Sequence, residues 1–538
     1  MISLVKMHWS SLTIIVPTIL LEVVLARAQD GNLLYFPNEN GGVSQILSER
    51  NVVEVIPPNL NLSDIRGTTV YENYVDKIIS MAIAKTTLTI NNLLIQNPHG
   101  DNVVFSPTSI AGALALVLLG ANGKTFDELI TFLGLASVSP DIASKSQLVH
   151  EQFGRMIEKL ISKTGFQIGQ DVTFASGIFV QTGYVIRPLY LQTAREIYKS
   201  EVVSVDYEGD AKNAQGTINS WVSEETNRKI RTILSEAPST DTKVIITTAL
   251  YFNAEWENKF FDGFTKRKPF YINGRRAPTN IEADMMVNGG FFPYYKDPNL
   301  ECEILGFPYK GNSTTMYVVM PFNSDRKKLK DLESKLTVWN LNRLVESTTY
   351  SDSLILFPKM KIQSTIDLRR SLQDLGIRSL FDPNEANLAL LASQDFKSRT
   401  RVGNNTDAES VTDPNENETE TQKTIKDRLD ISSRIDTAKV AYETLDRIRQ
   451  LINQQSTSNK YQNPGLYADQ IIHKVYMDIT ETGTEAAAAT AVSLTRTGAR
   501  VTFRVDVPFF FFIWHEETKT IIFWGSVLAP TPNFSTLI

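Results

Sequence analysis

The chain has 538 residues, with 54 basic and 60 acidic side chains, a formal net charge of −6, and 42% hydrophobic residues. This composition is typical of a globular protein and excludes a wholly disordered chain. The mildly acidic balance gives no reason to expect nucleic acid or an anionic membrane as a partner. The single cysteine, Cys302, excludes an intramolecular disulfide. We expect it to be structural, with a reactive thiol as the alternative.

The N-terminal segment is typical of a secretory signal peptide. Lys6 and His8 precede an apolar run over residues 12–25, and Ala26-Arg27-Ala28 is a small-x-small cleavage pattern. The run is short and is interrupted by Glu22, so it is a poor membrane span. We therefore predict a signal peptide over residues 1–28 and a secreted, extracellular protein that does not bind membranes, with an uncleaved N-terminal anchor as the alternative.

The rest of the chain divides by composition. Residues 29–72 lack periodicity and are predicted to be an extension, whereas helical and strand-like patterns alternate over residues 73–392. The predicted helices cover residues 109–119, 142–163, 211–224 and 368–375. The predicted strands cover residues 242–252, 315–320, 354–357, 501–505 and 509–514.

Residues 393–464 are predicted to be an insertion, because residues 406–421 are almost entirely polar and acidic. Later in this segment, apolar residues from Ile425 to Ile452 recur at helical spacing. This helix could lie on the domain surface or bind a partner. The folded domain then resumes over residues 465–538.

Five Asn-x-Ser/Thr sequons are candidate glycosylation sites, which would fit an extracellular protein. They are Asn61, Asn312, Asn404, Asn417 and Asn533.

The most informative segment covers residues 481–495, where four alanines follow Glu485. As a strand, its alternation would put Thr484 and every second residue to Leu494 on an uncharged face, with Glu485 on the other face. A segment that can be either an exposed loop or an inner strand is what a conformational switch requires.

The signatures of common enzymes fail. Gly123-Lys124-Thr125 could end a phosphate loop, but that motif requires a glycine five residues before Gly123, and this position is Leu118. His515-Glu516 lacks the second zincin histidine, and no Gly-x-Ser-x-Gly elbow is present. We expect no enzymatic activity, no cofactor and no metal.

Nine segments, in order along the chain, together resemble the serpin family. They are residues 102–110, 119–125, 218–222, 249–256, 307–312, 357–362, 473–474, 508–509 and 523–525. The resemblance covers about residues 73–392 and 465–531. It implies one α+β domain with three β-sheets, about nine helices and an exposed reactive-centre loop.

The resemblance also implies a function: a monomeric inhibitor that an extracellular serine protease attacks as a suicide substrate. Serpin loop insertion is itself a well-known example of strand addition and stored strain. The cleaved loop would enter the main sheet and trap the protease in a covalent complex. The alternative is a non-inhibitory serpin acting as a binding or carrier protein. The long extension and charged insertion resemble those of some secreted arthropod serpins, which implies a role in an extracellular immune or melanisation cascade.

The family pattern assigns residues to three roles. The hinge would comprise Glu481, Gly483, Thr484, Glu485, Ala486, Ala487, Ala488 and Ala489. The reactive bond would be Thr497–Gly498, for an elastase-like protease, or Arg496–Thr497, for a trypsin-like one. Control of sheet opening would involve Ser106, Ser109, Thr248, Trp256 and His473, although these residues could simply pack the core. Thr248 departs from the asparagine usual in the family and has fewer hydrogen-bonding groups.

Overall fold

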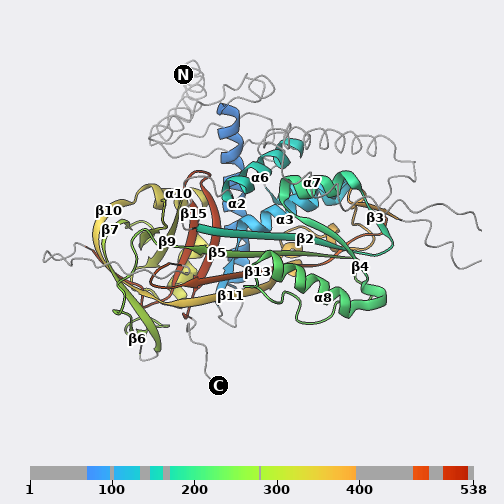
Figure 1. Ribbon diagram of the computed structural model, residues 1–538. Helices are drawn as coiled ribbons and strands as arrows, with labels where there is room; N and C mark the ends of the chain where they lie inside the picture. The colour runs from blue at the N-terminus through green and yellow to red at the C-terminus, as the bar shows by residue number, and fades with distance from the viewer. Residues whose placement is uncertain are drawn as a thin grey trace, which may run out of the picture.

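The computed structural model describes residues 69–96, 102–133, 146–161, 170–277, 280–394, 464–483 and 501–530 (Figure 1). The predicted signal peptide, residues 29–68 of the extension and residues 395–463 of the insertion lie outside this part of the chain. So do the sequons at Asn61, Asn404, Asn417 and Asn533.

A five-stranded sheet runs through the middle of the molecule (Figure 1). Its strands, in spatial order, are β11 (Met360–Asp367), β13 (Ala468–Ile479), β5 (Val244–Ala254), β2 (Gln170–Gln181) and β4 (Glu201–Val205). β13 and β5 are parallel neighbours, whereas β11 pairs antiparallel with β13, and β2 pairs antiparallel with β5. The two central strands are buried along most of their length, which explains why they contain so many β-branched and aliphatic residues.

Helices cover both faces of this sheet. On one face lies α8 (Tyr207–Glu225), which packs Ile218 and Val222 in a cluster with Phe179 and Tyr251 of the sheet. On the other lies α3 (Pro107–Gly120), whose residues are all buried. α3 begins at this point because the Ser106 side chain accepts a hydrogen bond from the Ser109 N–H and Pro107 occupies the first helical turn.

A nine-stranded sheet forms the other large layer. Its strands are β1 (Val103–Phe105), β16 (Thr520–Val527), β15 (Phe509–His515), β9 (Thr314–Pro321), β8 (Cys302–Pro308), β7 (Ile281–Asp297), β10 (Thr349–Pro358) and β14 (Val501–Arg504), with β6 (Lys266–Phe270) paired to β7. Every residue of β15 and β16 is buried, as the apolar run of β15 leads one to expect. A third, two-stranded sheet pairs β12 (Ala392–Gln394) with β3 (Tyr184–Ile186).

The remaining helices are α2 (Thr69–Leu94), α4 (Gly123–Phe132), α6 (Ser146–Ile161), α7 (Pro188–Tyr198), α9 (Arg326–Lys335), α10 (Val338–Glu346), α11 (Arg369–Asp374) and the 3-10 helix η1 (Ser379–Phe381). The described ranges thus contain nine α-helices and three sheets, which confirms the predicted α+β class. Each helix and strand predicted over a residue range overlaps an observed element of that kind. Eleven of the sixteen strands in the described ranges were not predicted, among them β2, β7 and β13. No helix within the described ranges is long and apolar enough to cross a membrane.

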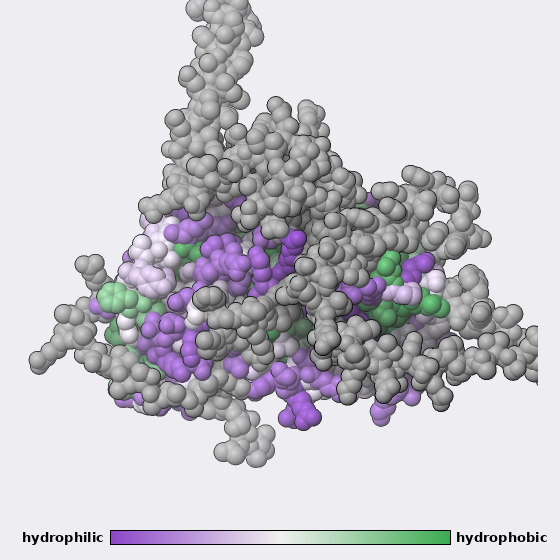
Figure 2. Space-filling view, turned by 45° about the horizontal axis from the view of Figure 1, so that its top comes forward, coloured by the Kyte–Doolittle hydropathy of each residue, from purple (hydrophilic) through white to green (hydrophobic). Residues whose placement is uncertain are grey.

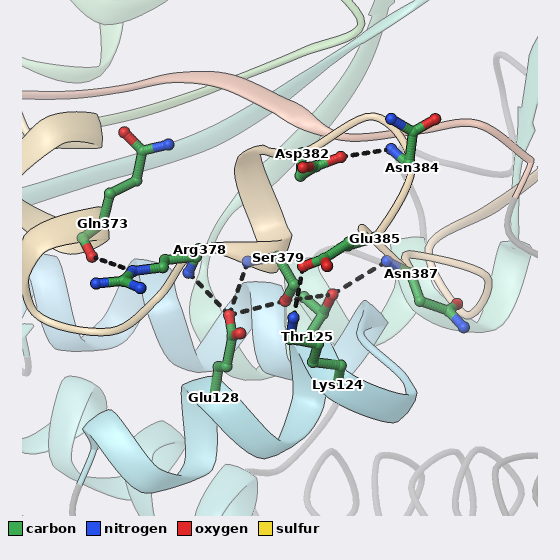
Figure 3. Close-up of polar contacts among 10 residues, drawn as sticks. All are labelled: Lys124, Thr125, Glu128, Gln373, Arg378, Ser379, Asp382, Asn384, Glu385 and Asn387. Atoms are coloured by element: carbon green, nitrogen blue, oxygen red, sulfur yellow. Dashed lines mark hydrogen bonds and ion pairs between the residues drawn. The ribbon is translucent and has the colours of Figure 1, made fainter.

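A polar cluster fixes the chain between α11 and β12 to α4 (Figure 3). The Glu128 carboxylate accepts hydrogen bonds from the backbone N–H groups of Arg378 and Ser379 and from the Ser379 hydroxyl, each at 2.8 Å. The Thr125 hydroxyl accepts a further bond from the Asn387 N–H at 3.1 Å. These contacts provide hydrogen-bond acceptors for the free backbone N–H groups at the start of η1. They therefore anchor the chain close to where the insertion begins.

Candidate functional site: the parallel seam and the entry turn

The first part of the site is the contact between β13 and β5, called the seam below. The two strands pair directly from Ala468 to Met477, with His473 opposite Thr248 and no strand between them. Parallel pairs are slightly less stable per residue than antiparallel ones. A strand running in the opposite direction could therefore replace one parallel contact with two antiparallel ones.

A buried histidine ties the seam to the start of α3. The Nε2 atom of His473 accepts a hydrogen bond from the Ser106 N–H at 2.8 Å, so Nε2 carries no proton. Burial lowers the pKa of His473 to about 3, and the neutral ring then carries its proton on Nδ1. That proton is donated to Thr248 Oγ1, which lies 2.6 Å away. The structure thus brings Ser106, Thr248 and His473 together, and the threonine hydroxyl keeps a bond to the ring.

Other hydroxyl groups close to the seam lack partners. Ser109 donates its N–H to Ser106 Oγ, but the hydroxyls of Ser109, Ser176 and Thr247 are buried with no hydrogen-bond partner among the described residues. Ser176 lies opposite Thr248 on β2, and Ser109 and Ser176 line a small cavity between α3 and the sheet. Each unpaired buried hydroxyl costs about 1–3 kcal/mol. Sequence reasoning found Ser109 but missed Ser176 and Thr247.

The second part of the site is the turn Thr480–Gly483, called the entry turn below, at which the chain leaves β13 and reverses. The Thr480 N–H donates to the Gly483 carbonyl at 2.9 Å, and the Gly483 N–H returns a bond to the Thr480 carbonyl at 3.3 Å. Gly483 also forms an antiparallel bridge with Glu255, directly after β5. It therefore already lies between the ends of the two seam strands.

Only glycine fits at this position. Gly483 has a φ of +126°, and a Cβ atom there would overlap the Ala254 carbonyl oxygen and lie 2.8 Å from the Trp256 backbone nitrogen. The first contact is closer than any real Cβ contact, and such a φ is rare for residues with a side chain. The hinge glycine is thus explained by close approach to the end of β5.

Trp256 holds the entry turn through two hydrogen bonds. Its indole N–H donates to the Thr480 carbonyl at 2.9 Å, and its backbone N–H donates to the Thr482 carbonyl at 3.2 Å. The ring stacks on Tyr309 with a centroid distance of 4.4 Å. Trp256 is only 2% exposed, so it both packs the core and holds the turn.

Glu481 anchors the outer side of the turn. Its carboxylate accepts hydrogen bonds from Lys359 Nζ at 2.8 Å and from Thr265 Oγ1 at 2.6 Å. Burial alone would raise the pKa of Glu481, but the bonds from Lys359 and Thr265 outweigh it and the pKa is lowered. Lys359 and Thr265 were missed by sequence reasoning because they lie far from Glu481 along the chain.

The other predicted residues are placed as follows. Thr484 to Ala489, and the candidate reactive residues Arg496, Thr497 and Gly498, lie outside the described residues. Asn312 is exposed between β8 and β9, so its glycosylation stays a prediction. Cys302 is buried, and burial raises the pKa of its thiol to about 12, which fits a structural role. No group of His, Cys, Asp or Glu within the described ranges could hold a metal ion.

Comparison with known proteins decides the family. A family model described as "Serpin (serine protease inhibitor)" matches residues 81–530. The chain belongs to the serpin family. Serine protease inhibitor 28Dc of Drosophila melanogaster is 31% identical over 505 residues, covering 87% of this chain and 85% of the fly protein.

Two further relatives agree with this assignment. The leukocyte elastase inhibitor of Xenopus tropicalis is 27% identical, with 84% of this serpin and 99% of the frog protein covered. The crystal structure of Serpin48 from Tenebrio molitor has a TM-score of 0.62 at 24% identity, covering 84% of this chain and 98% of the other, which supports the fold.

Proposed function

We propose that this serpin is a secreted suicide-substrate inhibitor of an extracellular serine protease. The observation that carries the proposal is the entry turn, which holds Gly483 between the ends of β13 and β5, in antiparallel bridges to Thr480 and Glu255. The named inhibitors among its relatives support inhibition as the general activity.

The observed pairing predicts how the hinge would enter. Gly483 bridges both Thr480 and Glu255, so each later residue would meet one residue further back on each strand. In this register Thr484 would lie between Ile479 and Ala254. Thr490 would lie between His473 and Thr248, which are hydrogen-bonded in the closed sheet. Insertion would thus break the hydrogen bond between His473 and Thr248.

The same register assigns the two faces of the hinge. Thr484, Ala486 and Ala488 would share a face with Ala254, Phe252 and Leu250, which belong to the main hydrophobic core. Glu485 would instead share a face with Asn253 and Asp478, which are only half-buried. The charged hinge residue would therefore stay near solvent while small uncharged residues fill the core side.

The chemistry is that of an interrupted hydrolysis. The protease serine Oγ attacks the carbonyl carbon of the reactive bond, the new N-terminal amine leaves with a proton, and an ester joins the two proteins. Insertion of the hinge would then draw the ester and the attached protease along the sheet. Distortion of the oxyanion hole and triad, whose groups are worth about 10²-fold or more each, would stop water from cleaving the ester.

The target depends on the reactive bond. Cleavage at Arg496–Thr497 would suit a trypsin-like protease, and cleavage at Thr497–Gly498 an elastase-like one. Secretion follows from the predicted signal peptide, and an extracellular immune or melanisation cascade is the setting we propose.

The direct test incubates the purified protein with pancreatic trypsin, chymotrypsin and elastase. We expect a covalent complex that survives boiling in SDS, and a released C-terminal fragment that begins at Thr497 or Gly498. Cleavage without a complex from any protease would contradict the proposal and favour a non-inhibitory carrier.

A matched pair of variants tests the register. Thr484→Arg would place a charge between Ala254 and Ile479, at a desolvation cost of several kcal/mol. We expect it to remain cleavable but to trap little protease. Glu485→Arg, one residue on, would lie beside Asp478 on the other face and should trap normally. Equal stoichiometry of inhibition in the two variants would contradict the predicted register.

A further inference from the structure

Exposed hydrophobic side chains gather at one end of the nine-stranded sheet. Five large hydrophobic residues are exposed in the described ranges, and four of them, Phe264, Phe291, Tyr350 and Leu354, lie in or next to β6, β7 and β10. We call these four residues the apolar face. The fifth, Val185, is on β3 at the opposite end of the molecule (Figure 1). Scattered exposed hydrophobics are normal, but a cluster marks an interaction site.

The pairing of β7 with β10 explains how the apolar face is built. Phe291 is opposite Asp352, and Leu354 is opposite Gly289, so Phe291 is a diagonal neighbour of Leu354 on the same side of the sheet. Tyr350, two residues before Asp352, lies on this side as well. Figure 2 shows green hydrophobic atoms at the left end of the molecule, where Figure 1 places β7 and β10.

Phe264 joins the cluster through Phe261. A Cβ atom on Gly289 would lie 3.6 Å from the Phe261 ring, which therefore sits beside the glycine. Phe261 and Phe264 pack edge to face with a centroid distance of 6.1 Å. Phe264 is 53% exposed and Phe291 is 66% exposed, so the aromatic rings remain open to solvent although they neighbour a well-packed core.

The apolar face lies close to where the reactive loop ends. The chain re-enters the described structure at Val501, the start of β14, and β14 pairs with β10 so that Thr502 is opposite Leu354. Thr502 is six residues after Arg496, six residues of chain reach at most about 20 Å, and paired strands are about 4.8 Å apart. The predicted reactive bond therefore lies within about 25 Å of Leu354. A protease domain of about 220 residues has a radius of gyration of about 17 Å, so a protease that holds the loop in its active site is large enough to touch this surface.

We propose that the apolar face is a docking surface for the body of the target protease. The inference rests on the proposed inhibitory function. A loop in an active site is a small contact, whereas stable interfaces bury about 800 Å² on each partner. Exposed aromatic residues provide contacts that dominate such interfaces. The face would then select among proteases that all accept the same loop sequence, and it would hold the encounter complex until the ester forms.

The experiment measures binding without the chemical step. The probe is trypsin or elastase, whichever the wild-type protein traps faster, with its catalytic serine replaced by alanine so that no ester can form. We expect the double variant Phe291→Ser/Leu354→Ser to bind this inert protease about tenfold more weakly. With the active protease, the second-order rate constant of complex formation should fall by a similar factor, while the stoichiometry of inhibition stays unchanged.

The control is Val185→Ser, which removes an equally exposed apolar residue far from the loop and should change neither quantity. Thermal unfolding checks that all variants are folded. Unchanged affinity and rate in the double variant would overturn the docking proposal alone, because the wild type would still trap protease. A wild type that traps no protease would overturn this inference together with the proposed function.

Discussion

The two sheets of this serpin contain central strands that are almost equally buried but differ in composition. At the seam, β13 and β5 pair in parallel and contribute Thr247, Thr248 and His473 to the interior. In the nine-stranded sheet, β15 and β16 pair antiparallel and pack Phe510 and Phe512 on Trp524. Burial alone therefore does not distinguish the two sheets. What distinguishes the seam is its parallel pairing and its buried polar groups, and this is where the proposed insertion would separate the strands.

We expect the largest effect from truncating a buried aromatic side chain in the nine-stranded sheet. Phe511 is fully buried, and its ring occupies the space in which a Cβ atom on Gly525 would lie. We expect Phe511→Ala to lower the free energy of unfolding by about 3–5 kcal/mol through cavity formation. Because the proposed insertion does not involve this sheet, the stoichiometry of inhibition should not change. Denaturant unfolding and titration of protease measure the two quantities, and a changed stoichiometry would contradict the proposed separation of roles.

At the seam we expect a smaller loss of stability but a larger change in the rate at which the inhibitor becomes inactive. His473→Ala would leave the Ser106 N–H and the Thr248 hydroxyl without their present partners, at a cost of about 2–3 kcal/mol. The proposed insertion would separate His473 from Thr248, so the variant should convert faster to an inactive, loop-inserted form on mild heating. The fraction of inhibitory activity remaining with time measures this. Thr248→Val, which removes one bond and keeps the ring, should have an intermediate effect.

Two buried groups, His473 at the seam and Glu333 on α9, should make stability depend on pH in opposite directions. Burial lowers the pKa of His473 to about 3, so its contribution to stability is present above pH 6.5 and is lost as the pH falls toward 3. Burial raises the pKa of Glu333 to about 8; within the described ranges its carboxyl accepts hydrogen bonds from the Asn91 amide and the Ser526 hydroxyl of β16. Its contribution is present below pH 4.5 and is lost as the pH rises toward 8, by up to about 1.4 kcal/mol per pH unit.

Glu333→Gln isolates the second effect. The amide keeps the shape and hydrogen bonds without a charge, so the decline in stability between pH 5 and 8 should flatten, while the acid limb set by His473 stays. Urea unfolding at several pH values provides the measurement. An unchanged slope between pH 5 and 8 would show that Glu333 is not protonated in the folded protein.

The smallest expected effect lies at the entry turn. Lys359→Met removes the cation that holds Glu481 but keeps most of the buried side-chain volume. Both groups are partly exposed, so we expect a loss of about 1 kcal/mol. Thr265→Val removes the other hydrogen bond to the same carboxylate, and we expect it to lower the free energy of unfolding by a similar amount. If neither variant alters stability or the rate of trapping, the carboxylate does not anchor the turn.

Sequence reasoning was most successful for periodic helices and for apolar strands such as β15, whose residues are dictated by burial. It missed β13 because a strand containing Asp469, His473 and Lys474 does not show the pattern of a buried strand. It placed Trp256 and Glu481 near the hinge only through the family resemblance. Lys359 and Ser176 could not be found at all, since their roles arise from contacts between distant segments, which no local pattern encodes.

The entry turn also has a kinetic consequence. Forming a new strand normally begins with an unfavourable step, because chain entropy is lost before any pairing compensates for it. In the proposed insertion that first pairing would already be present in the uncleaved protein, since Gly483 pairs with Thr480 and Glu255. Hairpins extend in about 1–10 μs, whereas hydrolytic turnovers at typical rates of about 1–10³ s⁻¹ take a millisecond or longer. Insertion of the hinge competes with hydrolysis of the ester. In this competition the first residue pair of the new strand would already be formed.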